Sequence, residues 1–96
     1  MKMEVVAIKS NILPTSYYTR ELGGIPSKQS RSHWISVRCV FHDDHNPSMS
    51  VNLNSGGFIC HACGAKGGDI IAFEMQRCRL SFKEALTKLS KDWRLE

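Results

Sequence analysis

Two pairs of side chains in this chain have the types and spacing of metal ligands. Cys39 and His42 form a Cys-x-x-His pair, and Cys60 and Cys63 form a Cys-x-x-Cys pair. Each spacing lets two donor atoms leave one tight turn, and two such turns supply the four ligands of a closed tetrahedral zinc site. We therefore expect one structural Zn²⁺, held by three thiolates and one imidazole, with no position left for a reactive water.

Other donors and other metals compete with this assignment. His45 could replace His42, but five residues would then separate it from Cys39 and the tight turn would be lost. His61 lies between two ligands on an extended segment and is expected on the surface. An iron–sulfur cluster suits thiolates, although a histidine ligand disfavours it. Zinc remains the favoured metal.

Catalysis by the chain itself is not expected. Asp43 and Asp44 are adjacent carboxylates beside His42, but neighbouring residues in a turn seldom converge on one substrate atom. The sequence holds no Gly-rich phosphate loop, nucleophile elbow or separated carboxylate pair. We therefore expect the metal to build the fold rather than to perform chemistry.

Alternating apolar and polar residues predict the strands that position the ligands. Residues 33–38, 48–53 and 57–61 read as strands, and residues 54–57 are a strong turn signal. Residues 64–68 read as a Gly-rich loop. The predicted fold class is α+β: a small zinc ribbon with an antiparallel sheet of at least three strands, flanked by short helices.

Two helices are expected after the ribbon. Asp69 caps the first, residues 70–77, whose apolar pattern leaves mainly Glu74 and Gln76 for solvent. Ser81 and Glu84 form a capping box for a second helix that ends near residue 91. Cys78, near their junction, is expected to be a buried free thiol.

The residues before the ribbon are less clearly patterned. Residues 1–10 fit either a helix or a strand. Residues 16–22 read as a short helix, for which Thr15 or Ser16 offers a capping oxygen. Tyr17 and Tyr18 are expected to pack in the core.

Length and composition indicate one domain over residues 1–96, with a zinc-ribbon core at 33–68 and C-terminal helices at 69–91. A chain this short buries a modest core, so a metal staple is expected. The sequence shows neither a secretory signal nor a run long enough to cross a membrane. A reducing cytoplasm is the expected location, where clustered cysteines usually bind metal.

The net charge of +4 lies before the ligands. Residues 1–38 hold six Lys/Arg against two Asp/Glu, residues 39–68 one against two, and residues 69–96 six against five. This mild bias suits an anionic partner but is also compatible with an ordinary surface.

The ligand spacing and its flanks resemble a known family. The segments CVFHDDHNPSMSV, FICHACGAKGGDIIAFEM and LSFKEALTKLS are similar to the Cys-His-Cys-Cys zinc-binding domain at the N-terminus of bacterial and phage DNA primases of the DnaG type. The likeness covers roughly residues 34–90. Val40, Met49 and Ala62 depart from the family pattern, and His45 stands where a lysine is common.

The resemblance implies a module that binds the single-stranded DNA template and supports a separate primase catalytic domain. A replicative helicase is a further expected partner. Basic residues would hold phosphates and exposed rings would stack on bases. The candidate contacts are Lys28, Arg31, Arg38 and Lys66 for phosphate, and His33 and Phe58 for stacking, with Trp34 also considered but favoured as a core residue.

The alternative is a protein-interaction module. In that case the zinc ribbon binds a replication partner instead of DNA, and an exposed apolar patch matters more than Arg31 or Lys66.

Overall fold

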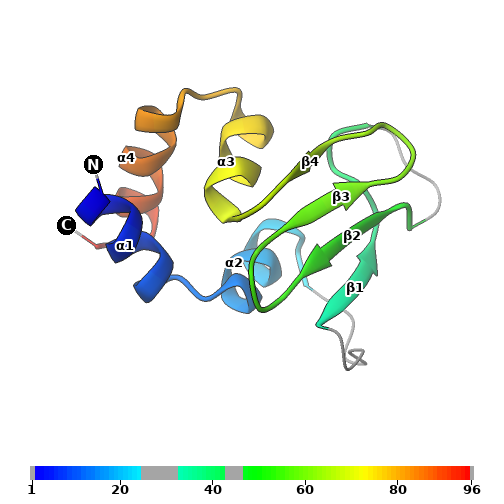
Figure 1. Cartoon of the computed structure of the whole chain (residues 1–96), viewed down its shortest axis with the longest axis horizontal. Coiled ribbons are helices and arrows are strands. Elements are labelled where there is room, and N and C mark those ends of the chain that lie inside the picture. Colours follow the sequence, from blue (N-terminus) through cyan, green and yellow to red (C-terminus); the bar gives the residue numbers. More distant parts are fainter. Residues whose placement is uncertain (1, 25–32, 43–46, 96) are drawn as a thin grey trace.

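The computed structural model describes residues 2–24, 33–42 and 47–95 as four helices and four strands. In chain order these are α1 (Lys2–Asn11), α2 (Pro14–Glu21), β1 (Trp34–Val37), β2 (Met49–Asn52), β3 (Phe58–Cys60), β4 (Lys66–Gly67), α3 (Ile70–Cys78) and α4 (Phe82–Asp92). The sheet lies at one end and the α1–α4 pair at the other, with α2 and α3 between them (Figure 1). The predicted α+β class is confirmed.

The strands form one antiparallel sheet in the order β1-β2-β3-β4. Ile35 pairs with Val51, which in turn pairs with Phe58, so these buried side chains share the inner face. Ser36 pairs with Ser50 on the opposite, outer face. Because side chains alternate along a strand, this register separates an apolar face for the core from a polar face for solvent.

The fourth strand was not predicted. Residues 64–68 read as a loop, yet Lys66 and Gly67 pair with Ile59 and Phe58 of β3. A Cβ atom at Gly67 would lie 2.7 Å from Phe58 and 2.7 Å from Ala72. The glycine is therefore needed for the close approach of β4 to α3, and two residues carry no periodicity by which a strand could be recognised.

Gly67→Ala should destabilise the fold by about 1–3 kcal/mol, because backbone or ring must shift to make room for the methyl group. Gly68→Ala is the matched control, since nothing lies within 4 Å of a Cβ atom there. Urea unfolding of the zinc-loaded variants measures both. Equal midpoints for the two variants would contradict the packing described here.

Aromatic rings fill the space between the sheet and the helices. Phe73 of α3 makes edge contacts with Phe58, Tyr17 and Tyr18, at centroid distances of 5.1, 5.8 and 5.0 Å. Tyr18 also donates a hydrogen bond of 2.6 Å to the carbonyl oxygen of Gly56, in the β2–β3 turn. The prediction that Tyr17 and Tyr18 are packing residues is confirmed.

The residues before the sheet form two helices. The ambiguity at residues 1–10 resolves as helix, because Ile8 and Ile12, four positions apart, are both buried. The predicted hydroxyl cap of α2 is wrong: Leu13 occupies the N-cap position without a side-chain hydrogen bond. Pro14 begins the helix instead, since its fixed φ suits the first helical position and it has no N–H to satisfy.

The predicted caps of the two C-terminal helices are confirmed. The Asp69 carboxylate accepts a hydrogen bond of 2.8 Å from the Ala72 N–H. Ser81 and Glu84 form the reciprocal capping box of α4. Ala85, Leu86 and Leu89 are the buried side of α4, which fixes the outward side of the helix.

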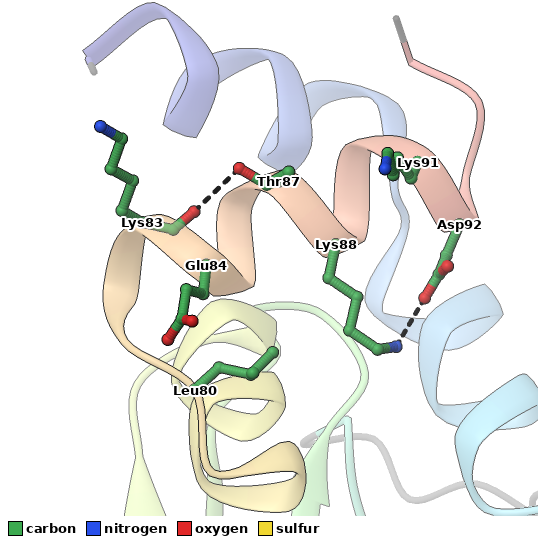
Figure 2. Close-up of a pocket in the computed structure, with 7 residues that line it drawn as sticks. All are labelled: Leu80, Lys83, Glu84, Thr87, Lys88, Lys91 and Asp92. Atoms are coloured by element: carbon green, nitrogen blue, oxygen red, sulfur yellow. Dashed lines mark hydrogen bonds and ion pairs between the residues drawn. The ribbon is translucent and has the colours of Figure 1, made fainter.

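The outward side of α4 carries a shallow groove of about 430 Å³ (Figure 2). It is lined by Leu80, Lys83, Glu84, Thr87, Lys88, Lys91 and Asp92. The helix that lines most of it, α4, lies at the end of the molecule remote from the sheet (Figure 1).

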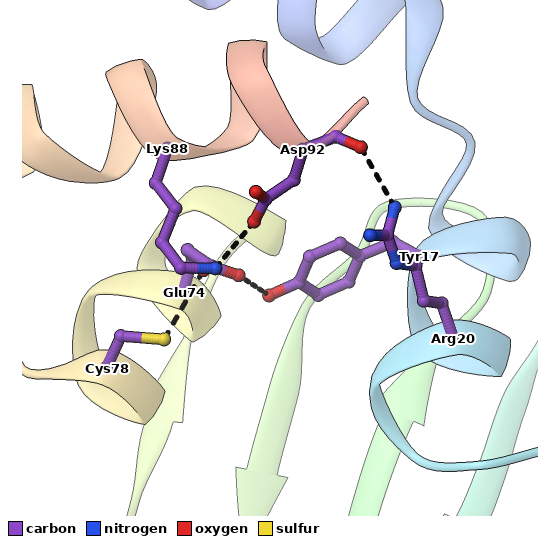
Figure 3. A network of polar contacts seen from close by, with 6 residues as sticks. All are labelled: Tyr17, Arg20, Glu74, Cys78, Lys88 and Asp92. Carbon is purple, nitrogen blue, oxygen red and sulfur yellow. Dashed lines mark hydrogen bonds and ion pairs between the residues drawn. The ribbon is translucent and has the colours of Figure 1, made fainter. Parts of the chain in front are cut away.

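Glu74 departs from its predicted solvent exposure, with only 1% of its surface accessible. Its carboxylate accepts a 2.7 Å hydrogen bond from the Tyr17 hydroxyl and lies 2.9 Å from the Lys88 ammonium, which also contacts Asp92 at 2.6 Å (Figure 3). Burial and this carboxylate together raise the pKa of Tyr17, so the phenol remains a donor. The helix pattern alone could not show that α2 and α4 cover this side of α3.

Cys78 also differs from prediction. It is exposed rather than buried, and its thiol donates a 3.4 Å hydrogen bond to Glu74. Its position at the last turn of α3 leaves it at the edge of the network rather than inside the core (Figure 3).

Lys88→Met should cost about 2–4 kcal/mol of folding free energy, because the buried Glu74 carboxylate loses its cation. This free-energy cost is below that of breaking a fully buried ion pair because the Lys88 side chain is 40% exposed. Lys83→Met, an exposed change on the same helix, should stay within about 0.5 kcal/mol. Chemical denaturation of both variants is the measurement, and equal stabilities would exclude a role for the pair.

No helix in the described ranges is both long and apolar enough to cross a membrane.

Candidate metal centre and nucleic-acid interface

The four predicted ligands converge in the structure. Their donor atoms all lie within 4.8 Å of one another. The Cys39 and Cys63 sulfur atoms are 3.7 Å apart, and the Cys60 sulfur lies 3.9 Å from Nδ1 of His42. A tetrahedron with Zn–S bonds of about 2.3 Å has sulfur–sulfur edges of about 3.8 Å. The arrangement therefore fits one tetrahedral zinc ion.

The ends of two strands position these donors. Cys39 follows β1 and Cys60 ends β3. In each turn a backbone N–H points at a cysteine sulfur: Phe41 donates to Cys39 at 3.3 Å, and Cys63 donates to Cys60 at 3.4 Å. Such hydrogen bonds stabilise sulfur in its charged, metal-binding form.

Hydrogen bonding and burial shift the thiol pKa values of Cys60 and Cys39 in opposite directions. At Cys60, burial favours the neutral thiol, but hydrogen bonds from the Cys63 N–H and the Ser48 hydroxyl outweigh it and lower the pKa. At Cys39, burial dominates and raises the pKa. Cys63 is exposed and Cys39 is buried, so the site has one sulfur open to solvent and others held inside.

Phe41 connects the first ligand turn to the core. Its ring stacks on Phe58 at 5.7 Å and contacts Phe73 edge-on at 5.2 Å. Correct placement of the Cys39–His42 turn is therefore coupled to the packing of the inner sheet face. This coupling was not visible in the sequence, where Phe41 is an isolated aromatic residue inside a polar turn.

Two of the competing donors, His61 and Cys78, lie outside the cluster. His61 is exposed, as predicted, and lies outside the group of converging ligands. His45, Asp43 and Asp44 lie outside the described residues. Cys78 belongs to the Glu74 network instead.

The outer face of the sheet is the second feature of the site. Register places Ser36, Ser50, Ile59 and Lys66 in one row across β1 to β4. Trp34 lies beside this row, opposite Asn52, and is 41% exposed. The face combines an accessible indole, small polar side chains and a lysine.

The candidate nucleic-acid residues are only partly brought together. Arg38 follows β1 and Lys66 lies in β4, and both are exposed, as is His33. Phe58 is a correction: it is 2% exposed and packs on Phe73, so its ring is in the core and unavailable for stacking. Lys28 and Arg31 lie outside the described residues.

Trp34 was favoured as a core residue, and this prediction is wrong. Ile35 and Val37 of β1 face the core, so the alternate positions of the strand, including Trp34, face outward. Strand alternation predicts that Trp34 and Ile35 lie on opposite faces of the sheet, but not that Trp34 stays partly exposed.

This geometry defines a zinc-ribbon domain. Residues 25–96 match the family model described as CHC2 zinc finger, and the chain belongs to that family. The match supplies the metal: the Cys-His-Cys-Cys cluster is that of one structural zinc ion.

Similar proteins carry the name DNA primase. The chain is 41% identical over 66 residues to that of Campylobacter jejuni and 48% identical over 63 residues to that of Helicobacter pylori, covering 69% and 66% of this chain. It spans about a tenth of those relatives, 11% of each. The gene 58 protein of Mycobacterium phage D29 is 40% identical over 53 residues, which are 55% of this chain and 40% of the phage protein.

A solved structure shares the fold. The Aquifex aeolicus primase, comprising zinc-binding and RNA polymerase domains, superposes with a TM-score of 0.74 at 25% identity over 95% of this chain and 21% of that one. The resemblance to the primase zinc-binding family is thus confirmed by sequence and by fold.

Cys63→Ser should reduce bound zinc well below one ion per chain, because it removes a thiolate from the four converging donors. Cys78→Ser is the matched control and should keep a full equivalent, since Cys78 lies outside the cluster. Atomic absorption after gel filtration measures the content. Because structural zinc contributes on the order of 10 kcal/mol to small domains, Cys63→Ser should also lower the unfolding temperature strongly. Unchanged zinc content in Cys63→Ser would remove this residue from the ligand set.

Proposed function

We propose that this chain is a zinc-dependent module that binds single-stranded DNA as the template of a primase. Cys39, His42, Cys60 and Cys63 are the proposed zinc ligands. The metal closes the ribbon, and with four protein ligands it serves structure rather than chemistry. On this proposal residues 1–96 act as one domain, and synthesis of the primer belongs to a separate catalytic domain.

The outer face of the sheet is the observation that carries the proposal. Trp34 offers a ring on which a base can stack, and Lys66 and Arg38 offer cations for phosphates. The small side chains of Ser36 and Ser50 leave the centre of the face open to a ligand. Rings accept any base, so this arrangement favours binding of a single strand with little sequence readout.

Further contacts are proposed on the same basis. His33 precedes Trp34 and is exposed at the edge of the face. Lys28 and Arg31 remain proposed phosphate contacts from the segment before β1. Neutralisation of about three to five phosphates would give log affinity a slope of about −2 to −3.5 against log salt. The relatives named DNA primase support a role in replication. As protein partners we propose a primase catalytic domain or a replicative helicase.

A second candidate function rests on the groove of α4. Its volume of about 430 Å³ and its place at the far end from the metal suit a bound protein segment (Figure 2). Here the chain would be a protein-interaction module that recognises a replication partner. This function predicts that changes on α4, and not on the sheet, abolish binding.

Trp34→Ala should weaken binding of a short fluorescent single-stranded DNA by about five- to 150-fold, because stacking is worth about 1–3 kcal/mol per base. Phe82→Ala is the matched control: Phe82 is 39% exposed, close to the 41% of Trp34, but lies on α4. Anisotropy titrations of the zinc-loaded proteins at two salt concentrations measure both variants.

Two outcomes would contradict the proposal. One is absence of binding by the zinc-loaded parent to any single strand at low salt. The other is equal affinity of the Trp34→Ala variant and the parent, combined with a loss in Phe82→Ala, which would remove the DNA-binding surface from the sheet.

A further inference from the structure

We propose that the single strand leaves the sheet across β4 and that Arg79, at the C-terminal end of α3, binds one of its backbone phosphates. This inference rests on the proposed function. It extends the proposed binding surface from the outer face of the sheet to the C-terminal end of α3.

The end of α3 lies against the edge of the sheet. The Gln76 side chain donates a 2.8 Å hydrogen bond to the carbonyl oxygen of Lys66 in β4. One turn earlier, Ala72 is in close contact with the backbone of Gly67. Ala72 and Gln76 are four residues apart on the side of α3 that meets β4, and Arg79 follows the last helical residue, three positions after Gln76.

This placement continues a cationic path. Lys66 is exposed at the β4 end of the outer-face row, and Arg79 is exposed one helical turn beyond the residue that contacts the Lys66 backbone. A backbone that crosses the short edge strand would therefore meet a second cation directly. Single-strand sites track the phosphates in this manner, with a groove or ridge of basic residues beside the stacking platform.

The charge of Arg79 is not used inside the fold. Among the described residues it makes neither an ion pair nor a side-chain hydrogen bond, whereas Lys9 and Lys88 pair with carboxylates. The nearest acidic side chains along the sequence are already engaged: Glu74 with Tyr17 and Lys88, and Glu84 in its capping box. Among the described residues, the Arg79 guanidinium therefore remains available to an anion.

The backbone of Arg79 closes the end of α3 without using the side chain. Its φ and ψ of 54° and 52° are left-handed, a conformation that favours glycine or asparagine at a helix end. Its N–H and that of Leu80 both reach the Met75 carbonyl oxygen, hydrogen bonds that a glycine would make equally well. The helix end therefore does not need the arginine side chain, so a glycine variant tests the charge of that side chain.

A helix-end cation also interacts favourably with the helix dipole, so the test needs a control that shares this effect. Arg94 supplies it. It follows the end of α4, has a φ of 53°, and is exposed without an ion pair among the described residues. It follows α4, and α4 and the C-terminal end of the chain lie at the opposite end of the molecule from the sheet (Figure 1).

The experiment compares Arg79→Gly with Arg94→Gly in the zinc-loaded full chain, using fluorescent oligothymidylates of about 5 and about 15 nucleotides. Arg79→Gly should weaken binding of the longer strand about fivefold at about 0.1 M salt and reduce the salt slope by about 0.7, the loss of one phosphate contact. Arg94→Gly should match the parent. The shorter strand, which occupies the sheet alone, should bind all three proteins equally.

Arg79→Lys keeps the charge and should keep the parental slope. Circular dichroism confirms folding, and Arg79→Asn replaces the glycine variant should that variant not fold. Equal binding by Arg79→Gly and the parent, or an equal loss in Arg94→Gly, would overturn the assignment of Arg79. Failure of the parent to bind either strand would instead refute the proposed template binding itself.

Discussion

The zinc tetrahedron is the constraint on which the rest of this structure depends. The strands are two to four residues long, too short for stable independent pairing, and the metal joins the end of β1 to the end of β3 across the sheet. The coupling continues inward, because Phe41 between the first two ligands stacks on Phe58 and meets Phe73. Loss of the metal would release a ring from the core as well as two ligand turns from each other.

The sheet uses its two faces for different purposes. The inner face is closed by the aromatic cluster around Phe73 and by the network of Glu74, which joins α2, α3 and α4 (Figure 3). No helix in the described ranges covers the outer face, although this face includes a tryptophan. Rigid packing on one side holds the other side in a fixed geometry, which would lower the ordering cost of the proposed binding to a flexible strand.

Short-range chemistry made much of this architecture predictable from sequence. Ligand spacing identified the four converging donors, strand alternation identified β1, β2 and β3, and the caps at Asp69 and Ser81 fixed where α3 and α4 begin. Each of these signals is contained within a few neighbouring residues. β4 was not predicted because a strand of two residues shows no alternation of apolar and polar side chains. The predicted hydroxyl cap of α2 was wrong because the helix begins at Pro14, ahead of Thr15 and Ser16.

The remaining errors concern which surfaces are covered, a property that local pattern does not contain. Glu74 was assigned to solvent and is buried, because Tyr17 and Lys88 arrive from two other helices. Trp34 was expected in the core and Phe58 on the surface, and the structure shows the reverse. The large ring of Trp34 suggested a core anchor, but Trp34 lies at an outward position of β1. Among the proposed contact residues, Arg38 and Lys66 were found from charge alone, whereas Arg79 required the packing of α3 on β4.

The central claim, that the zinc-closed sheet presents its outer face to a single strand, is tested most directly by a two-dimensional nitrogen–proton NMR titration of the zinc-loaded protein with short single-stranded DNA. The account predicts chemical-shift changes concentrated at the amides of Ser36, Ser50, Ile59 and Lys66 and at the Trp34 indole. The chemical shifts of the outward residues of α4 should not change. Shifts confined to α4, or a spectrum unchanged by DNA at low salt, would contradict it.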